Sequence, residues 1–122
     1  ALLDTLEYLE KGGRIGKARA LLGGLLKIKP LITITEGEVG EFGKVRSRQA
    51  GIQKLHDACV EAGKIESLVV AYSTEEDDAL ELASRLTHVL PEGETPLVAR
   101  VGPVIGAHAG PRVIALGMVK SP

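Results

Sequence analysis

The chain is organised around one stretch, Val101-Gly102-Pro103-Val104-Ile105-Gly106-Ala107-His108-Ala109-Gly110-Pro111-Arg112. Apolar, β-branched runs at residues 95–101 and 113–119 flank it, and each run predicts a β-strand. Because Gly permits backbone conformations closed to other residues and Pro fixes φ, the stretch predicts a shaped loop between two strands. His108 is its one side chain that both donates and accepts hydrogen bonds near neutral pH. The loop is therefore a candidate anion site, although a tight crossover with an exposed histidine fits the same spacing.

Composition narrows the class of protein. The 122 residues suffice for one compact domain, and 44% of them are hydrophobic, which allows a sizeable core. Three aromatic residues and a net charge of −1 argue against a nucleic-acid-binding surface, which needs stacking platforms or a basic field. The single cysteine excludes an internal disulfide and a cysteine-rich zinc site, and we expect no metal site. No signal peptide or transmembrane run is visible, so we expect a cytoplasmic location.

The chain opens on a helical pattern. Apolar residues at helical spacing over residues 2–9 predict a helix that Lys11-Gly12-Gly13 ends. Residues 16–26 predict a second helical segment with a break at Gly23-Gly24. Because the chain lacks an initiator Met and enters the helical pattern almost at once, we expect a fragment of a longer protein whose partner domain is absent.

Strands and helices follow in alternation. Residues 28–35 and 38–45 predict a β-hairpin around Glu36-Gly37. A helix capped by Ser47 is predicted to about residue 62, then a central strand over 67–72 that is buried on both faces. Ser73 or Thr74 is expected to cap the next helix, and the unit over 67–101 should be a right-handed parallel crossover. The predicted fold is α/β, a mixed β-sheet with packed helices.

Basic residues alternate where the second strand of the predicted hairpin ends. Lys44, Arg46 and Arg48 would project from one face of an extended chain. Three cations on one face repel each other unless an anion or carboxylates lie nearby, so the row favours an anion-facing surface. The alternative is a solvated edge, since charged side chains are common on edge strands.

Three segments, taken together, resemble one family. They are Leu6-Glu7-Tyr8-Leu9-Glu10-Lys11-Gly12-Gly13-Arg14-Ile15, then Ile28-Lys29-Pro30 with Lys44-Val45-Arg46, then Gly102-Pro103-Val104-Ile105-Gly106-Ala107-His108-Ala109-Gly110-Pro111. In this order they are similar to the C-terminal half of the DegV family of bacterial fatty-acid-binding proteins. The resemblance covers nearly the whole chain. It implies that residues 1–122 form a single domain, the C-terminal half of a two-domain protein whose N-terminal domain is absent here.

The resemblance also implies a function. Proteins of this family hold one long-chain fatty acid between two α/β domains and present it to a fatty-acid kinase, which makes an acyl phosphate. The carboxylate is held by hydroxyl groups of the N-terminal domain and by the histidine of a His-x-Gly-Pro motif, here His108. Arg14 and Arg46 resemble the family's basic residues near that carboxylate, and Gly106 and Gly110 should leave room for the ligand beside His108.

Two positions depart from the family pattern. The family usually has Thr after the histidine and Gly after the proline, whereas this chain has Ala109 and Arg112. The first change removes a hydroxyl group from the neighbourhood of the expected carboxylate site. The second adds a cation and a side chain to a turn that elsewhere has neither.

The function expected from these motifs is that of a lipid-binding carrier, not an enzyme, with no cofactor besides the bound fatty acid. One alternative is an enzyme acting on an anionic metabolite, with His108 as acid or base and Arg14 and Arg46 as anion clamps. No nucleophile–base pair or carboxylate dyad is evident, which disfavours catalysis. Another alternative is a regulatory interaction domain that binds no small molecule.

Overall fold

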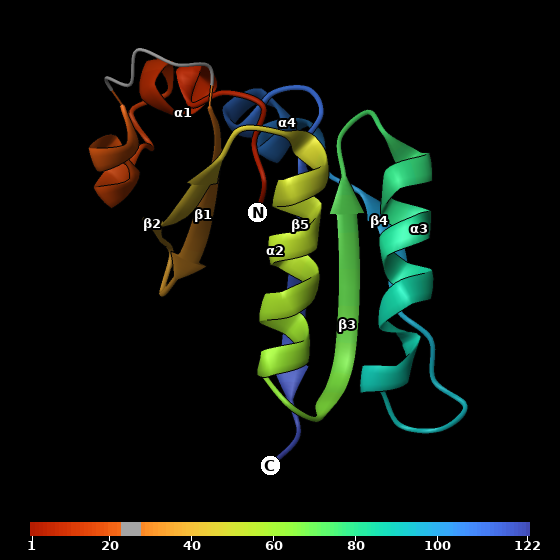
Figure 1. Ribbon diagram of the computed structural model, residues 1–122. Helices are drawn as coiled ribbons and strands as arrows, with labels where there is room; N and C mark the ends of the chain where they lie inside the picture. The colour runs from red at the N-terminus through yellow and green to blue at the C-terminus, as the bar shows by residue number, and fades with distance from the viewer. Residues whose placement is uncertain (23–27) are drawn as a thin grey trace.

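The structure is a computed structural model that describes residues 1–22 and 28–122. The predicted break at Gly23-Gly24 and the end of the helix predicted over 16–26 lie outside the described residues. The elements follow one another in this order (Figure 1): α1 Glu7–Lys11, the 3-10 helix η1 Gly16–Leu21, β1 Lys29–Thr35, β2 Glu38–Val45, α2 Arg48–Glu61, β3 Ile65–Tyr72, α3 Glu76–Leu86, the 3-10 helix η2 Thr87–Val89, β4 Leu97–Arg100, α4 Pro103–Ala109 and β5 Ile114–Lys120.

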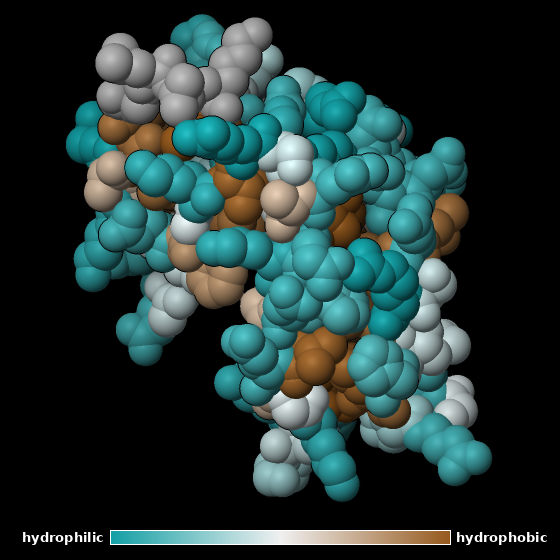
Figure 2. Space-filling view, viewed as in Figure 1, coloured by the Kyte–Doolittle hydropathy of each residue, from teal (hydrophilic) through white to brown (hydrophobic). Residues whose placement is uncertain are grey.

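The larger sheet has the strand order β4-β3-β5 and is mixed, as predicted. β3 pairs with β4 in parallel through the α3 crossover, and with β5 antiparallel. Helices α2 and α3 lie against one face of this sheet (Figure 1). Leu68 and Val70 of β3 point into the core beneath these helices and are buried. On the surface of this side, apolar residues appear in patches between hydrophilic ones (Figure 2).

The prediction that β3 is buried on both faces is wrong. Within the predicted range 67–72 only Leu68 and Val70 are buried, whereas Val69 and Ala71, which alternate with them, are only partly covered. Successive side chains of a strand point to opposite faces, so the second face of the sheet lacks a complete cover in this part of the molecule. Leu97 of β4 and Val119 of β5 are 65% and 54% exposed.

The β1–β2 hairpin forms where it was predicted. Its turn places Glu36 at φ 51° and Gly37 at φ 79°, the pair of positive angles that a tight two-residue hairpin turn requires. β1 carries a register shift between Leu31 and Ile32, one residue beyond Pro30, and proline in a strand is commonly found at such irregularities.

Residues 2–6 were predicted to be helical, and this prediction is wrong. Leu2 is extended and forms antiparallel bridges to both Leu31 of β1 and Ile114 of β5. Its N–H donates to the Ile114 carbonyl at 2.8 Å, and its carbonyl accepts from the Ile114 N–H at 3.2 Å. Leu2 therefore joins the hairpin to the larger sheet, and its fully buried side chain lies in the core. These long-range backbone bonds outweigh a local helical spacing, and α1 begins only at Glu7.

A second core lies on the other side of β1. Leu31 packs in the core beneath α2 and α3, whereas its neighbour Ile32 packs in a separate cluster. That cluster consists of buried residues from α1, η1, α4 and the segments beside them: Leu3, Leu6, Leu9, Ile15, Ala18, Leu21, Ile32, Ala109 and Val113. Helices α1 and α4 therefore lie together at one end of the molecule (Figure 1), and this end positions the candidate site.

Candidate functional site

The stretch at residues 101–112 is not a loop throughout, because it contains α4. Gly102 is its extended N-cap and Pro103 its first residue, where the missing N–H of proline costs nothing and its φ suits a helix. Gly110 ends it at φ 83°, a conformation that residues with a Cβ rarely adopt. The glycine inside the helix, Gly106, did not prevent the helix from forming. Gly102 and Pro103 mark the start of α4, and Gly110 marks its end.

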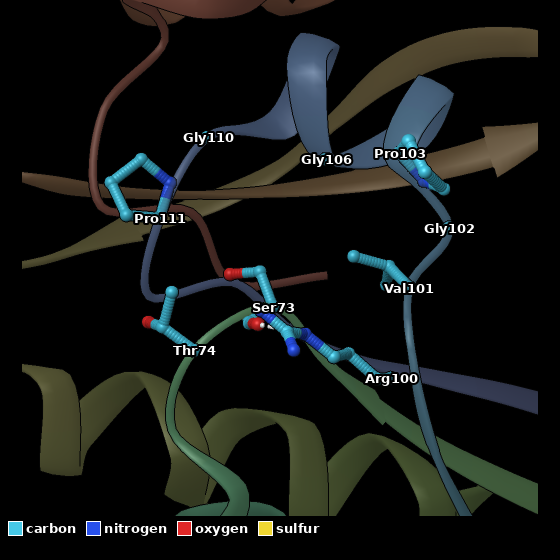
Figure 3. Close-up of a pocket in the computed structure, with 9 residues that line it drawn as sticks. All are labelled: Ser73, Thr74, Arg100, Val101, Gly102, Pro103, Gly106, Gly110 and Pro111. Carbon is cyan, nitrogen blue, oxygen red and sulfur yellow. Dashed lines mark hydrogen bonds between the residues drawn. The ribbon is translucent and has the colours of Figure 1, made fainter.

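One face of α4 borders a pocket of about 550 Å³ at the carboxyl ends of the parallel strands β3 and β4 (Figure 3). The carboxyl edge of parallel strands is where α/β sheets commonly bind ligands. Nine residues line the pocket: Ser73, Thr74, Arg100, Val101, Gly102, Pro103, Gly106, Gly110 and Pro111. They come from the end of β3, the end of β4, α4 and the turn after it.

Hydrogen bonds tie the floor of this pocket to the turn that follows α4. The hydroxyl of Ser73 accepts the N–H of Val113 at 2.9 Å, and that of Thr74 accepts the N–H of Arg112 at 3.0 Å. The guanidinium Nε of Arg100 donates to the Ser73 carbonyl at 3.2 Å. The prediction that Ser73 or Thr74 caps α3 is wrong, because the N-cap is Glu75 and neither hydroxyl caps the helix.

His108 lies on the opposite side of α4 from the pocket. Gly106 and Gly110 are four residues apart and share the pocket side, whereas His108 is two residues from each. Its imidazole lies against Gly12 of the α1 terminus, so close that a Cβ at Gly12 would collide with the ring. No hydrogen bond joins the ring nitrogens to another residue of the described ranges. The structure thus separates His108 from the two glycines that were expected to leave room beside it.

Arg14 is placed by the end of α1. The Arg14 N–H donates to the Leu9 carbonyl at 2.9 Å and the Gly13 N–H to the Glu10 carbonyl at 3.1 Å, with Gly13 at φ 70°. This is the Schellman motif, in which the left-handed residue is usually glycine. The predicted helix stop is therefore confirmed. Gly12 leaves space for His108 and Gly13 reverses the chain, so Arg14 emerges exposed two residues beyond the contact with His108.

A second glycine contact ties α1 to α4. A Cβ at Gly110 would lie 2.5 Å from Cδ2 of Tyr8, one turn before Gly12 on α1. Tyr8 meets Gly110 and Gly12 meets His108, so each helix supplies one glycine and one ring. The first and third of the segments that carry the family resemblance are therefore packed directly on one another.

The basic row at the end of β2 is only partly present. Lys44 and Arg46 are exposed, but Arg48 is the first residue of α2 and turns inward. Its Nε donates to Asp78 at 2.7 Å and its Nη1 to the Arg112 carbonyl at 2.6 Å, and its side chain is only 11% exposed. The chain leaves the extended conformation at Ser47, which caps α2 as predicted, so the strand alternation ends before Arg48. Arg46 makes no ion pair with the described residues.

Comparisons with known proteins now identify the family. Residues 1–121 match the family model described as "Uncharacterised protein, DegV family". The chain belongs to the DegV family. It is 39% identical over 121 residues to a DegV domain-containing protein of Streptomyces coelicolor, covering 98% of this chain and 42% of that protein. The chain thus spans less than half the length of the curated relatives it matches.

Solved structures of DegV proteins share the fold. A DegV family protein from Thermus thermophilus, whose description names fatty-acid binding, superposes with a TM-score of 0.81 at 35% identity, over 94% of this chain and 42% of that one. A stearic-acid-binding protein from Eubacterium ventriosum superposes with a TM-score of 0.69 at 27% identity, over 98% and 43%. Both of these proteins are described as binding fatty acids.

The structure accounts for one of the two departures from the DegV pattern. Arg112 adopts φ 62°, a left-handed conformation that suits the usual glycine and is strained for arginine. Its backbone is held by Thr74 and Arg48, and its guanidinium lies 3.7 Å from Asp4 and 3.8 Å from Glu75. Ala109 is buried in the second core and does not face the pocket.

Sequence reasoning missed Ser73, Thr74 and Arg100 as site residues. Their positions at strand ends were the available signal. Ser73 and Thr74 directly follow β3, and Arg100 is the last residue of β4, which pairs with β3 in parallel. The part of the chain that the structure describes contains no cluster of His, Cys, Asp and Glu able to hold a metal ion. Among the same residues, no helix has the length and apolar character needed to cross a bilayer.

Proposed function

We propose that this chain is one half of a fatty-acid carrier. It binds a long-chain fatty acid at an interface with a companion N-terminal domain and presents the carboxylate to a fatty-acid kinase. The observation that carries this proposal is the match to the Thermus thermophilus protein, whose described property is fatty-acid binding and which has the same fold at 35% identity. The chain covers 42% of that protein, which leaves the greater part for the companion domain.

The open face of the larger sheet supports a role in covering an acyl chain. Val69 pairs with Leu97 and Gly117 in register, so all three share the face opposite α2 and α3. The same face carries a row of alanines, one from each strand, and ends near the exposed Val119. Each CH₂ group that leaves water contributes about 0.8 kcal/mol, so an apolar face of this kind suits an acyl chain or the companion domain that encloses it.

The α1–α4 contact supports a role in reading the carboxylate. The ring nitrogens of His108 form no hydrogen bond with a described residue, although Nδ1 lies against Gly12, and Arg14 emerges from the adjoining turn. A carboxylate in a partly dry site needs charge-assisted donors, and these two side chains supply them. Arg46 is exposed at the end of β2 and would contribute to the basic surface that meets the kinase. No histidine or carboxylate lines the pocket, so the enzyme alternative finds no acid–base pair there.

The test for His108 compares a long-chain fatty acid with its methyl ester. Losing a hydrogen bond to a charged group costs roughly 1.5–3 kcal/mol, so His108→Ala in the intact protein should weaken binding of the acid about tenfold to a hundredfold. Binding of the ester, which lacks the charge, should change much less. His88→Ala is the matched control, because His88 is exposed on η2. Equal losses for acid and ester would mean that His108 only supports the packing of α4 on α1.

The test for the arginines measures kinase turnover. Arg14→Ala and Arg46→Ala, each made in the intact protein, should lower acyl-phosphate formation while the free energy of unfolding stays within about 0.5 kcal/mol, as expected for exposed side chains. Arg85→Ala on α3 serves as the control for loss of a surface charge. Unchanged turnover and unchanged fatty-acid binding in both variants would reduce Arg14 and Arg46 to ordinary surface charges.

A further inference from the structure

The pocket beside α4 presents hydrogen-bond donors, and no carboxylate residue is among those that line it. Ser73 is the one polar residue that is buried among the described residues, with 8% of its surface exposed. Its hydroxyl oxygen already accepts the N–H of Val113. A hydroxyl has one proton to donate, and no acceptor for the Ser73 proton lies within hydrogen-bond distance among the described residues. The Ser73 hydroxyl can therefore donate a hydrogen bond to a ligand in the pocket.

Thr74 is held in the same way. Its oxygen accepts the N–H of Arg112, and its only described acceptor is a carboxylate oxygen of Glu75 at 3.5 Å, the outer limit of a hydrogen bond. The Glu75 carboxylate also lies 3.8 Å from the guanidinium of Arg112, and this cation partly offsets the negative charge of Glu75. The turn after α4 therefore holds both hydroxyls by one accepted N–H each, which leaves the Ser73 proton unpaired among the described residues and the Thr74 proton with only the long contact to Glu75.

Arg100 adds a positive charge beside Ser73 in the lining of the pocket (Figure 3). Only its Nε is engaged, by the Ser73 carbonyl, which orients the guanidinium and leaves the four N–H groups of Nη1 and Nη2. No carboxylate of the described residues forms an ion pair with Arg100. The carboxylate of Glu76, the first residue of α3, instead accepts the hydroxyl of Tyr72 at 2.6 Å.

The remaining walls of the pocket define the size and polarity of a ligand. Val101, Pro103 and Pro111 are apolar, and the three glycines of the lining let a ligand approach the backbone closely. A volume of about 550 Å³ lies within the range of small-molecule sites. A guanidinium and two hydroxyl donors beside apolar walls match a small molecule that has one oxyanion and a short apolar body.

We propose that Arg100, Ser73 and Thr74 form a second binding site, for the carboxylate or phosphate group of a small ligand. This site does not depend on the proposed fatty-acid function, because His108 and Arg14 lie on the other side of α4. Arg100 binds the oxyanion through its free Nη groups. Ser73 and Thr74 donate their protons to it, and the turn after α4 keeps both hydroxyls in place.

The experiment follows backbone amide signals of the intact protein by NMR during titration with inorganic phosphate or hexanoate, at constant ionic strength set with sodium chloride. We expect saturable shifts at Ser73, Arg100 and Val113, with a dissociation constant in the millimolar range, from at least one of the two anions. Hexanol, which has the chain of hexanoate without its charge, should produce no such shifts. Response to phosphate alone or hexanoate alone would indicate which oxyanion the site accepts.

The variants separate this site from a general charge effect. Arg100→Gln should weaken binding about tenfold to a hundredfold, as expected for loss of a charged donor, whereas Arg85→Gln on α3 should leave it unchanged. Thr74→Val keeps the shape of the side chain and should weaken binding severalfold. Three results would each overturn the proposal: no saturable shifts with either anion, equal shifts with hexanol and hexanoate, or equal loss in Arg100→Gln and Arg85→Gln. Shifts confined to Gly12 and Arg14 would assign the anion to the α1–α4 contact and would equally overturn it.

Discussion

The effect of Gly12→Ala on the free energy of unfolding should depend on His108, because the new Cβ would meet the His108 ring. The backbone of Gly12, at φ −81° and ψ −2°, is open to any residue, so alanine alone would stabilise the end of α1 by about 0.4–1 kcal/mol. The added Cβ, however, would collide with Nδ1 of His108 and lie 2.8 Å from Cε1. Overpacking of this kind costs about 1–3 kcal/mol, and moving the ring off its rotamer is part of that cost. The net effect expected in the native protein is a destabilisation of about 1 kcal/mol.

The assay is a double-mutant cycle of Gly12→Ala and His108→Ala, followed by urea denaturation of the four proteins. In the His108→Ala background the collision is gone, so Gly12→Ala should become neutral or stabilising, and the coupling free energy should be about 1–3 kcal/mol. The Cβ also comes within 3.2 Å of the Tyr8 carbonyl, but that contact is present in both backgrounds and cancels. The same change in stability in both backgrounds, within about 0.5 kcal/mol, would refute the packing of His108 on Gly12.

The neighbouring glycine provides the control for this cycle. Gly13 has φ 70°, and nothing lies within 4 Å of the position that a Cβ would occupy, so Gly13→Ala meets only the backbone penalty of the left-handed conformation. That penalty is about 1 kcal/mol and should be the same with or without His108. Two adjacent glycines therefore carry different physical signatures, one steric and dependent on His108, the other conformational and independent of it.

Buried or paired groups give three further predictions. The hydrogen bond from Lys29, at 2.6 Å, lowers the pKa of Asp4 below its ordinary 3.8. This pair therefore stabilises the fold above about pH 4, and the stabilisation is lost as the pH falls through the lowered pKa. Asp4→Asn should lower the melting temperature more at pH 7 than at pH 2, and equal losses at both would contradict this. Arg48→Met should destabilise the protein by about 2 kcal/mol in urea denaturation, less than for a fully buried pair because Asp78 is 37% exposed, and a change below about 0.5 kcal/mol would show that the pair contributes nothing measurable. Burial raises the pKa of the Cys59 thiol, so a thiol reagent should modify it only at the rate of unfolding, and rapid reaction in the native protein would contradict its burial.

Elements whose signals are local could be predicted from the amino-acid sequence. The hairpin follows from the β-branched run over residues 28–35 and the turn residues Glu36-Gly37, and α2 follows from a capping Ser47. The end of α1 follows from Gly12-Gly13 and the mixed sheet from the order of strands and helices. These signals act over a few residues, through backbone φ preferences and side-chain-to-backbone hydrogen bonds, and need no knowledge of the rest of the chain.

Which of these residues meet depends on the folded chain. Leu2 has the spacing of a helical residue, but its partners are 29 and 112 residues away, and the backbone bonds that they offer draw it into the sheet. The motif around His108 has the composition of a loop, yet α4 turns its alternate residues to opposite sides, with Gly106 facing the pocket and His108 facing Gly12. Arg100 and Ser73 lie 27 residues apart and meet because a parallel crossover brings the carboxyl ends of two strands to one edge. Local conformational preferences allow each of these conformations. Burial and long-range hydrogen bonds decide which one forms, because their contributions to the free energy exist only in the folded chain.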